Sequence, residues 1–375
     1  MKLLITGANG FIAKNLRAEL MEKKYSDIDL MLFDRDSSID ELDKYCAECD
    51  YVIHLAGINR PLTEDEFMNG NAGFTSELLS LLRKYNNKSP IIVSSSIQAS
   101  LDNPYGKSKK AMEDLLFAYG KENNVKVYIY RLPNVFGKWC RPNYNSAIAT
   151  FANNIANNLE IQVNDRNHEM NLVYIDDVIK EFIKTIRGQE NRKGDYCYVE
   201  PVLHTTLGEI VDTLYSFKEY RKGLKVPYND NLLTKYLYAT FLSYVPADQM
   251  SYYLDEHVDN RGSFTEIIRT VGQGQFSVNI THPGITKGNH FHHTKHEKYL
   301  VVQGTALVLL RKIGEDKIYE YKLSGKKLVV VDIPVGYTHS ITNIGEDELI
   351  TFMWANEPFD QNNPDTIFEE VRKHE

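Results

Sequence analysis

The first 240 or so residues alternate short apolar runs with longer stretches whose apolar positions recur at helical spacing. Each short run is rich in β-branched residues, which favours a buried strand, and each longer stretch fits an amphipathic helix. Strands separated by helices in this order are typical of a parallel sheet with helices on both faces. We therefore predict a doubly wound α/β domain with strands at Leu3–Thr6, Leu30–Phe33, Tyr51–His54, Ile91–Ser94 and Val127–Arg131.

After about residue 247 the pattern changes to short strands in which apolar and polar residues alternate, with glycines between them. This pattern predicts an antiparallel β-sandwich or barrel. Pro246 lies where the two patterns meet, so we predict one domain at 1–246 and a second at 247–375. The clearest expected strands of the second domain are Tyr299–Val302, Ala306–Leu310 and Leu328–Ile333.

The charge balance excludes some classes of partner. The chain has 375 residues, with 43 Lys or Arg against 51 Asp or Glu, and a formal net charge of −8. It offers no broad basic surface to a phosphate backbone, so we expect no nucleic-acid partner.

The apolar run at the N-terminus is too short for a secretory signal, and no run of about 18 apolar residues could span a bilayer. We predict a cytoplasmic protein without membrane insertion.

Four cysteines are too few for a disulfide framework in a chain of this length. Cys46 and Cys49 have CxxC spacing, but no second pair or nearby histidine completes a zinc set, and the pair lies in a charged, helix-like stretch. We interpret these two cysteines as structural rather than as redox-active or metal-binding.

A glycine-rich segment, Gly7-Ala8-Asn9-Gly10-Phe11-Ile12-Ala13, follows the first strand and begins a helix. A backbone without side chains can turn tightly there and bring a pyrophosphate to the amides of the helix N-terminus. Ala13 stands where the usual fingerprint has its last glycine, and it still allows close helix packing. We predict a Rossmann-like dinucleotide site rather than an ordinary tight turn, with cofactor contacts from Gly7, Asn9, Gly10, Phe11 and Ile12.

The second strand ends at Asp34-Arg35, which bears on the choice of cofactor. An acid at this position normally binds the adenosine ribose hydroxyls, whereas an adjacent arginine can hold a 2′-phosphate. The two residues therefore favour different cofactors. We predict NADPH, because packing against apolar residues does not explain an arginine at position 35. The alternative is that Arg35 is simply a solvated surface residue.

A serine-ended strand is followed by a possible proton-transfer pair. Ser96 closes the run Ser94-Ser95-Ser96, and nine residues later Tyr105-Gly106-Lys107-Ser108-Lys109 begins a helix. The i, i+4 spacing places Tyr105 and Lys109 on one helical face, where the ammonium could lower the phenol pKa and reach a nicotinamide ribose. Following a glycine-rich turn in this order, the pair predicts proton donation to a developing alkoxide.

Further motifs give residues 1 to about 240 a resemblance to the extended short-chain dehydrogenase/reductases that act on nucleotide sugars. They are Val52–Gly57, Arg131–Gly137 and Val173–Val178. The resemblance implies that Ser96 is the catalytic serine, Tyr105 the proton donor and Lys109 the lysine that tunes the tyrosine. It also implies cofactor contacts from Leu55, Ala56, Gly57, Tyr105 and Lys109, and substrate contacts from Asn134, Arg141 and Arg166.

The second domain contains a four-ligand pattern. Gly284, His290, His292, Glu297 and Gly304 match the first half of the cupin motif, and Pro334 to Asn343, with His339, matches the second. Leu328 stands where that second half usually begins with glycine. His290 and His292 are i, i+2 on an expected strand and point to one side, where Glu297 and His339 can converge on them. We predict a cupin β-barrel with one divalent metal on these four residues, and expect zinc, although iron, manganese and nickel fit the same donors.

Asp259 to Glu266 resembles the opening of sugar-nucleotide 3,5-epimerase cupins, which implies that Arg261 faces a diphosphate. A surface turn arginine is the alternative.

Both halves together resemble the CapF (FnlB/WbjC) family of bifunctional capsule and O-antigen enzymes. The resemblance implies conversion of UDP-2-acetamido-2,6-dideoxy-L-arabino-4-hexulose to UDP-2-acetamido-2,6-dideoxy-β-L-talose. Because the C3 proton is acidic only while C4 is a ketone, we expect metal-assisted C3 epimerisation in the cupin to precede NADPH-dependent C4 reduction.

Three other functions fit parts of the sequence. A nucleotide-sugar 4-epimerase or simple ketoreductase could carry the cupin as a structural or oligomerisation unit. A redox sensor could bind NADP without turnover, although it would have no need of a proton donor. An oxygen-using cupin could hold iron on three histidines and a glutamate. We expect a homodimer, as is common for such reductases and for cupins.

Overall fold

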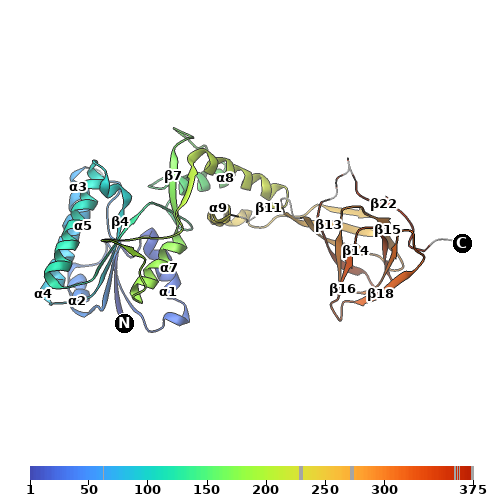
Figure 1. The fold of residues 1–375 in the computed structure, drawn as a ribbon, viewed down its shortest axis with the longest axis horizontal. Coiled ribbons are helices and arrows are strands. Elements are labelled where there is room, and N and C mark those ends of the chain that lie inside the picture. The colour runs from blue at the N-terminus through green and yellow to red at the C-terminus, as the bar shows by residue number, and fades with distance from the viewer. Residues whose placement is uncertain are drawn as a thin grey trace. The chain divides into compact units, whose positions relative to one another are not determined.

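The structure is a computed structural model that describes residues 1–61, 63–227, 231–270, 274–358, 360, 362 and 364–372. It divides into two compact units, residues 1–215 with 236–246 and residues 216–235 with 247–375. The first unit is built on a mostly parallel sheet, and the second is built on β-sheets apart from helical residues within 216–235, so the predicted fold class is confirmed (Figure 1). The boundary at Pro246 remains our prediction, and the structure adds that residues 216–235 group with the second unit.

The main sheet of the first unit has the strand order β2-β1-β3-β4-β5-β9-β8, and its β8–β9 pair is antiparallel. The order reverses between β1 and β3, which is the switch point at which doubly wound folds bind ligands. Leu3, Leu4 and Ile5 of β1 are fully buried, as expected for a sheet covered on both faces. The strands are β1 Lys2–Thr6, β2 Asp29–Phe33, β3 Tyr51–His54, β4 Ile91–Ser96, β5 Val127–Leu132, β8 Arg192–Lys193 and β9 Tyr196–Cys197.

Helices cover both faces of this sheet. In Figure 1, α2, α4 and α5 lie on one face and α1 and α7 on the other. α5 begins at Pro104 because the Asn103 side-chain oxygen accepts the backbone N–H of Gly106 (2.7 Å) and proline at the first helical position needs no partner. The helices are α1 Phe11–Leu20, α2 Ile39–Glu48, α3 Asp65–Met68, α4 Phe74–Lys84, α5 Pro104–Asn123, α6 Ala147–Ala156, α7 Ile175–Ile186, α8 Leu207–Lys222 and α9 Leu232–Leu242.

A second, three-stranded sheet of the first unit has the order β10-β7-β6. Its strands are β6 Asn134–Phe136, β7 Glu169–Tyr174 and β10 Leu203–Thr206. β6 follows β5 after Pro133 alone, so the chain passes directly from the main sheet into the second one. This passage brings Asn134 close to the carboxyl edge of the main sheet.

The second unit consists of two sheets, antiparallel apart from the short β11–β13 pair. One has the order β11-β13-β14-β21-β16-β19, with β12 beside β13, and the other has the order β18-β17-β20-β15-β22. Val308 and Leu310 of β17 join a core cluster with Tyr299 and Val301 of β16. Because β16 and β17 belong to different sheets, this core lies between the two.

The bounds of these strands are β11 Lys225–Val226, β12 Glu256–Asp259, β13 Gly262–Thr270, β14 Gly274–Thr281, β15 Thr286–Phe291, β16 Glu297–Gln303, β17 Thr305–Lys312, β18 Ile318–Ser324, β19 Val330–Ile333, β20 Tyr337–Asn343, β21 Leu349–Ala355 and β22 Ile367–Phe368. The predicted strands agree with these within two residues. The expected strand at β19 is too long, because β19 begins at Val330 and not at Leu328. The apolar run was misleading there, because Leu328 is 64% exposed and outside the sheet.

Candidate functional site

A cavity of about 910 Å³ lies at the carboxyl ends of the parallel strands. This is where doubly wound sheets bind ligands, because the loops after the strands diverge around the switch point. Nearly all the site residues predicted for the first domain line this cavity. They are Gly7, Asn9, Gly10, Phe11, Ile12, Asp34, Arg35, Leu55, Ala56, Gly57, Ser96, Tyr105, Lys109, Asn134 and Arg141.

The glycine turn at the start of α1 has the geometry that a dinucleotide needs. Gly7 has φ +68°, and a Cβ there would lie 2.7 Å from the backbone nitrogen of Ala56, so only glycine fits without strain. The Gly10 N–H donates to the Gly7 carbonyl (2.9 Å), and Gly10 caps α1 without a side-chain hydrogen bond. The first amides of α1 are therefore available to an anionic group, with their partial positive charge at the cavity.

Asp34 and Arg35, which follow the end of β2, line the same cavity. The Asp34 carboxylate accepts the backbone N–H groups of Asn9 (2.7 Å) and of Arg35 (2.7 Å). It thereby connects the end of β2 to the glycine turn. Arg35 itself is exposed and lines the cavity, so its guanidinium can reach a ligand there.

Ser96, Tyr105 and Lys109 are brought together from β4 and α5. Burial raises the pKa of Tyr105, and a hydrogen bond with the Ser96 side chain opposes that rise. The predicted lowering of this pKa by Lys109 is wrong for this geometry, because the Lys109 ammonium donates to the Ser94 carbonyl oxygen (3.2 Å). A phenol with a raised pKa stays protonated at neutral pH, which suits a proton donor.

Lys109 is 6% exposed, and burial lowers its pKa to about 8, with Glu113 acting in the opposite direction. Glu113 is fully buried one turn further along α5. Its carboxylate accepts two hydrogen bonds from Arg131 (2.9 and 2.6 Å) and one from the Ser95 hydroxyl (2.6 Å). These bonds from the half-buried Arg131 and from Ser95 to a buried carboxylate fix α5 against β4 and β5.

Sequence reasoning missed Asn71, whose side chain approaches Gly57 as that of Lys109 does. Its side chain accepts the Ile58 N–H (3.0 Å) and donates to the Ile58 carbonyl (2.9 Å) and to the Ser108 hydroxyl (2.9 Å). A Cβ at Gly57 would lie 2.7 Å from the Asn71 side-chain oxygen and 3.2 Å from the Lys109 nitrogen. Gly57 therefore allows the loop after β3 to pass close to both side chains. No motif pointed to Asn71, because its role depends on contacts distant in the chain.

Of the three residues predicted to contact the substrate, two line the cavity and one does not. Asn134 and Arg141 line the cavity, and Arg141 lies over the Tyr144 ring at 5.1 Å. Arg166 is not among the described lining residues, since its guanidinium pairs with Asp212 (2.7 Å) at the surface. The sequence could not distinguish these arginines because their partners are distant in the chain.

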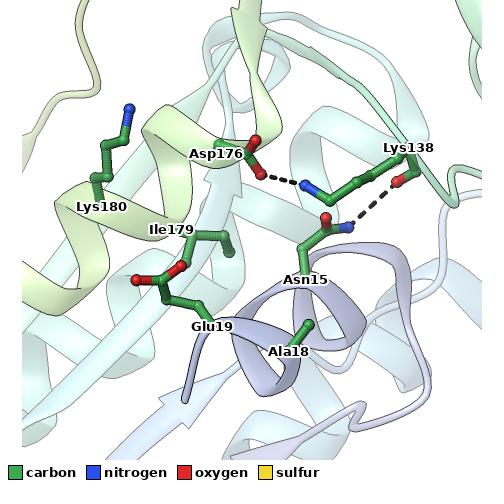
Figure 2. Close-up of a pocket in the computed structure, with 7 residues that line it drawn as sticks. All are labelled: Asn15, Ala18, Glu19, Lys138, Asp176, Ile179 and Lys180. Atoms are coloured by element: carbon green, nitrogen blue, oxygen red, sulfur yellow. Dashed lines mark hydrogen bonds and ion pairs between the residues drawn. The ribbon is translucent and has the colours of Figure 1, made fainter. Parts of the chain in front are cut away.

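A smaller cavity of about 330 Å³ lies between α1 and α7 (Figure 2). Lys138 pairs there with Asp176 of α7, and Asn15 of α1 donates to the Lys138 carbonyl oxygen (3.3 Å). None of the predicted site residues lines this cavity among the residues that the structure describes. Its contacts connect the two helices.

The two cysteines of the CxxC pair are buried in the first unit. Burial raises the pKa of both thiols, to about 12 for Cys46, which disfavours the reactive thiolate. Cys49 also contacts the Ser89 hydroxyl at 3.9 Å. These surroundings agree with the structural interpretation.

In the second unit, His290, His292, Glu297 and His339 form one cluster whose ligand atoms all lie within 4.8 Å of one another. β15 carries His290, and His292 follows directly after it. β20 carries His339, and Glu297 begins β16 of the facing sheet. The cluster therefore joins the two sheets, and Glu297, His292 and His339 are buried.

The donor set fits a divalent cation. His292 Nε2 and His339 Nε2 are buried without a hydrogen-bond partner, at 3.8 and 3.5 Å from the same Glu297 oxygen. Two ligands that each bind a tetrahedral ion at about 2.1 Å stand roughly 3.4 Å apart, so these separations suit a shared metal. Burial, with the neighbouring His339 and His292, lowers the pKa of His290 to about 4, so this imidazole is neutral at pH 7 and able to bind a cation.

Other residues near the cluster have identifiable contacts. Lys295 lies 3.3 Å from the second Glu297 oxygen, while His293 and His296 are exposed. Burial of Glu297 favours its neutral form, but His292, His339 and Lys295 outweigh that effect and lower its pKa. Arg261 donates to Asp259 in the β12–β13 turn (3.0 and 2.6 Å) and is exposed, so its predicted contact with a diphosphate remains a prediction.

Two families match the chain. Residues 3–197 match the NAD dependent epimerase/dehydratase family, and residues 257–367 match the polysaccharide biosynthesis C-terminal domain. A protein of Pseudomonas aeruginosa described as UDP-2-acetamido-2,6-beta-L-arabino-hexul-4-ose reductase is 44% identical over 366 residues, which cover 98% of each chain.

Solved structures agree with these matches. The crystal structure of the capsular polysaccharide assembling protein CapF from Staphylococcus aureus is similar with a TM-score of 0.92 and 51% identity, over 99% of this chain and 100% of that one. A structure of CapF with the inhibitor 3-isopropenyl-tropolone gives a TM-score of 0.87 and 47% identity over the same shares. Among the described residues, no helix combines the length and apolarity needed to cross a bilayer.

Proposed function

This chain belongs to the NAD dependent epimerase/dehydratase family and is similar over its full length to CapF. On that premise we propose that it is a bifunctional nucleotide-sugar enzyme. It epimerises C3 of UDP-2-acetamido-2,6-dideoxy-L-arabino-4-hexulose and then reduces C4, giving UDP-2-acetamido-2,6-dideoxy-β-L-talose for capsule or O-antigen synthesis. The observation that carries the proposal is that Ser96, Tyr105 and Lys109 line one cavity with the glycine turn.

The reductase residues act on the ketone oxygen. Bound NADPH supplies the hydride for C4. The Ser96 hydroxyl holds the carbonyl oxygen by a hydrogen bond, and Tyr105 donates its phenolic proton to that oxygen as negative charge develops. The Lys109 ammonium, which donates to the Ser94 carbonyl oxygen at the cavity, would bind the nicotinamide ribose and so orient the cofactor. Asn134 and Arg141 are the residues we propose to hold the nucleotide sugar at the mouth of the cavity.

NADPH is the cofactor we propose, in preference to NADH. Arg35 is exposed at the cavity beside Asp34, where a guanidinium can bind a 2′-phosphate with two hydrogen bonds. Asp34 already accepts two backbone N–H groups, so its carboxylate has less capacity left for the ribose hydroxyls of NADH. Both observations support the phosphorylated cofactor.

The second unit carries the epimerase step in this proposal. A divalent cation, which we propose is zinc, supplies Lewis-acid polarisation of the C4 carbonyl when bound. His290, His292, Glu297 and His339 hold it, and Arg261 binds the diphosphate. The step precedes reduction, because the C3 proton loses its acidity once C4 is an alcohol. We also propose a cytoplasmic homodimer.

Isotope exchange and product analysis test the proposal directly. The 4-keto sugar is incubated with the protein in D2O without NADPH, and NMR follows deuterium at C3. We expect exchange at C3, and after NADPH is added we expect the talose product with NADP⁺ in equal amount. Reduction without any exchange at C3 would favour a simple ketoreductase whose second unit is structural, and NADPH binding with neither activity would favour a redox sensor.

A further inference from the structure

The last described segment of the chain, residues 364–372, returns to the metal-ligand strand, and we call it the C-terminal segment. Its strand β22 pairs antiparallel with β15, placing Phe368 opposite His290 and Ile367 opposite Phe291. The Glu369 N–H donates to the Asn289 carbonyl (3.0 Å), which continues the pairing. The segment therefore forms the edge of the sheet that carries His290 and His339.

A buried arginine anchors this segment. Arg311 of β17 is 2% exposed, and its guanidinium donates to the backbone carbonyls of Val371 (2.8 Å) and Glu370 (2.7 Å). Val371 is itself 1% exposed. The Thr338 hydroxyl, one residue before the ligand His339, donates to the Glu369 carbonyl. A buried guanidinium left without these acceptors is costly, so the segment is held firmly.

Asp365, at the start of the segment, binds the loop between two of the metal ligands. Its carboxylate accepts the backbone N–H groups of His293 (2.8 Å), Thr294 (2.7 Å) and Lys295 (2.8 Å). This loop lies between His292 and Glu297 in the chain. Four atoms of the loop donate to one carboxylate, since the Thr294 hydroxyl does so as well (3.1 Å), and the loop is thereby fixed in one conformation.

The backbone carbonyl of Asp365 accepts a hydrogen bond from Nδ1 of His292, 73 residues earlier in the chain. A proton on Nδ1 leaves the lone pair on Nε2, and Nε2 is the atom that is buried without a partner beside Glu297 and His339. A hydrogen bond of this kind fixes both the tautomer and the ring orientation of a metal-binding histidine.

We propose that Asp365 is a positioning residue of the metal centre, and that the C-terminal segment completes that centre without binding the metal. The carboxylate fixes the 293–295 loop and so keeps the Asp365 carbonyl against His292. The affinity for the cation then depends on a residue that makes no bond to it. This inference rests on the proposed metal centre and adds a further determinant of its affinity.

Metal affinity tests it without any need for enzymatic activity. Zinc affinity is measured by competition with a chelator, and the visible spectrum of the cobalt-loaded protein reports the ligand geometry. We expect Asp365→Ala to weaken zinc binding about 10- to 100-fold and to change the cobalt spectrum. Asp365→Asn keeps one acceptor oxygen and should recover part of the affinity. Asp347→Ala, an exposed aspartate of the same unit, is the matched control and should bind like wild type.

The possible results separate the two proposals. Wild-type affinity and an unchanged spectrum in Asp365→Ala overturn the role of Asp365, even if the unfolding midpoint of the metal-free protein falls. Equal loss of affinity in Asp365→Asn and Asp365→Ala also contradicts it, because the hydrogen-bond acceptor would then not matter. If the wild-type protein binds no divalent metal, the proposed metal centre itself is wrong. If Asp365→Ala is too unstable to purify, the comparison of Asp365→Asn with Asp347→Ala decides, with an intermediate affinity and an altered spectrum expected.

Discussion

The reductase cavity and the metal centre are assembled in different ways. The cavity is formed by loops that follow successive parallel strands, so short motifs in chain order, such as Gly7–Ala13 and Tyr105–Lys109, meet at one edge of the sheet. The metal centre takes His290 and His339 from one sheet and Glu297 from the other, and its loop is fixed by Asp365 at the far end of the chain. The first site depends on topology and the second on the packing of two sheets.

If the sites are chemically separate, a change at one should leave the other unaffected. Tyr105→Phe removes the proton donor, and we expect NADPH oxidation to fall about 10²- to 10⁴-fold. Exchange at C3 in D2O should persist at the wild-type rate, because the second unit is unchanged. Stopped-flow absorbance and NMR measure the two activities. Loss of both together would contradict the separation.

The converse change is His339→Ala, which removes one of the four proposed metal ligands. We expect the bound metal to be lost and C3 exchange to fall at least about 100-fold, since Lewis-acid assistance contributes several kcal/mol. Metal analysis and NMR give the two readouts. His282→Ala is the matched control, because His282 lies outside the cluster in the same unit. Normal exchange in His339→Ala would remove the cluster from the mechanism.

The cofactor end of the cavity can be tested separately from its catalytic end. Arg35→Ala removes the proposed contact with the 2′-phosphate, and charge-assisted hydrogen bonds contribute about 1.5–3 kcal/mol. We expect kcat/KM for NADPH to fall about 10- to 100-fold while that for NADH changes little. An equal fall with both cofactors would show that Arg35 does not read the phosphate.

The pH dependence of the two activities should also differ. Burial lowers the pKa of Lys109 to about 8, so its ammonium is lost as the pH rises through that value. We expect kcat/KM for NADPH oxidation to fall above about pH 8, with no matching limb in C3 exchange. Lys109→Arg, which stays charged, should remove the limb even if its activity is lower. A flat profile up to pH 10 would contradict this role of Lys109.

The smallest effect is expected at Arg166. Its guanidinium is paired with Asp212 at the surface and does not line the cavity. We expect Arg166→Ala to change KM for the nucleotide sugar less than about twofold, because exposed ion pairs contribute little. Arg141→Ala, at a residue that lines the cavity, is the comparison and should raise KM more. A large effect at Arg166 would show that it reaches the substrate.

Much of both sites was predictable because local spacing fixes local geometry. Two glycines after a strand predict a tight turn, and a tyrosine four residues before a lysine lies on the same face of a helix as that lysine. The structure places all four residues at one cavity. His290 and His292 were likewise expected on one side of a strand, and both join the cluster although β15 ends at Phe291, one residue before His292. The direction of the Tyr105 pKa was not predictable, because it depends on burial and on where the Lys109 ammonium points.

The alternation of the main strands with helices, the turn at Gly7 and the residue types of both sites could be predicted from the sequence, since these depend on neighbours within one turn or one strand. The pairing of Arg166 with Asp212, the approach of Asn71 and Lys109 to Gly57, and the binding of the loop after His292 by Asp365 became visible only in the folded chain. Those contacts join residues distant in the chain. The packing of sheets and helices decides which polar groups come close to one another. Those that become buried then require hydrogen-bond partners.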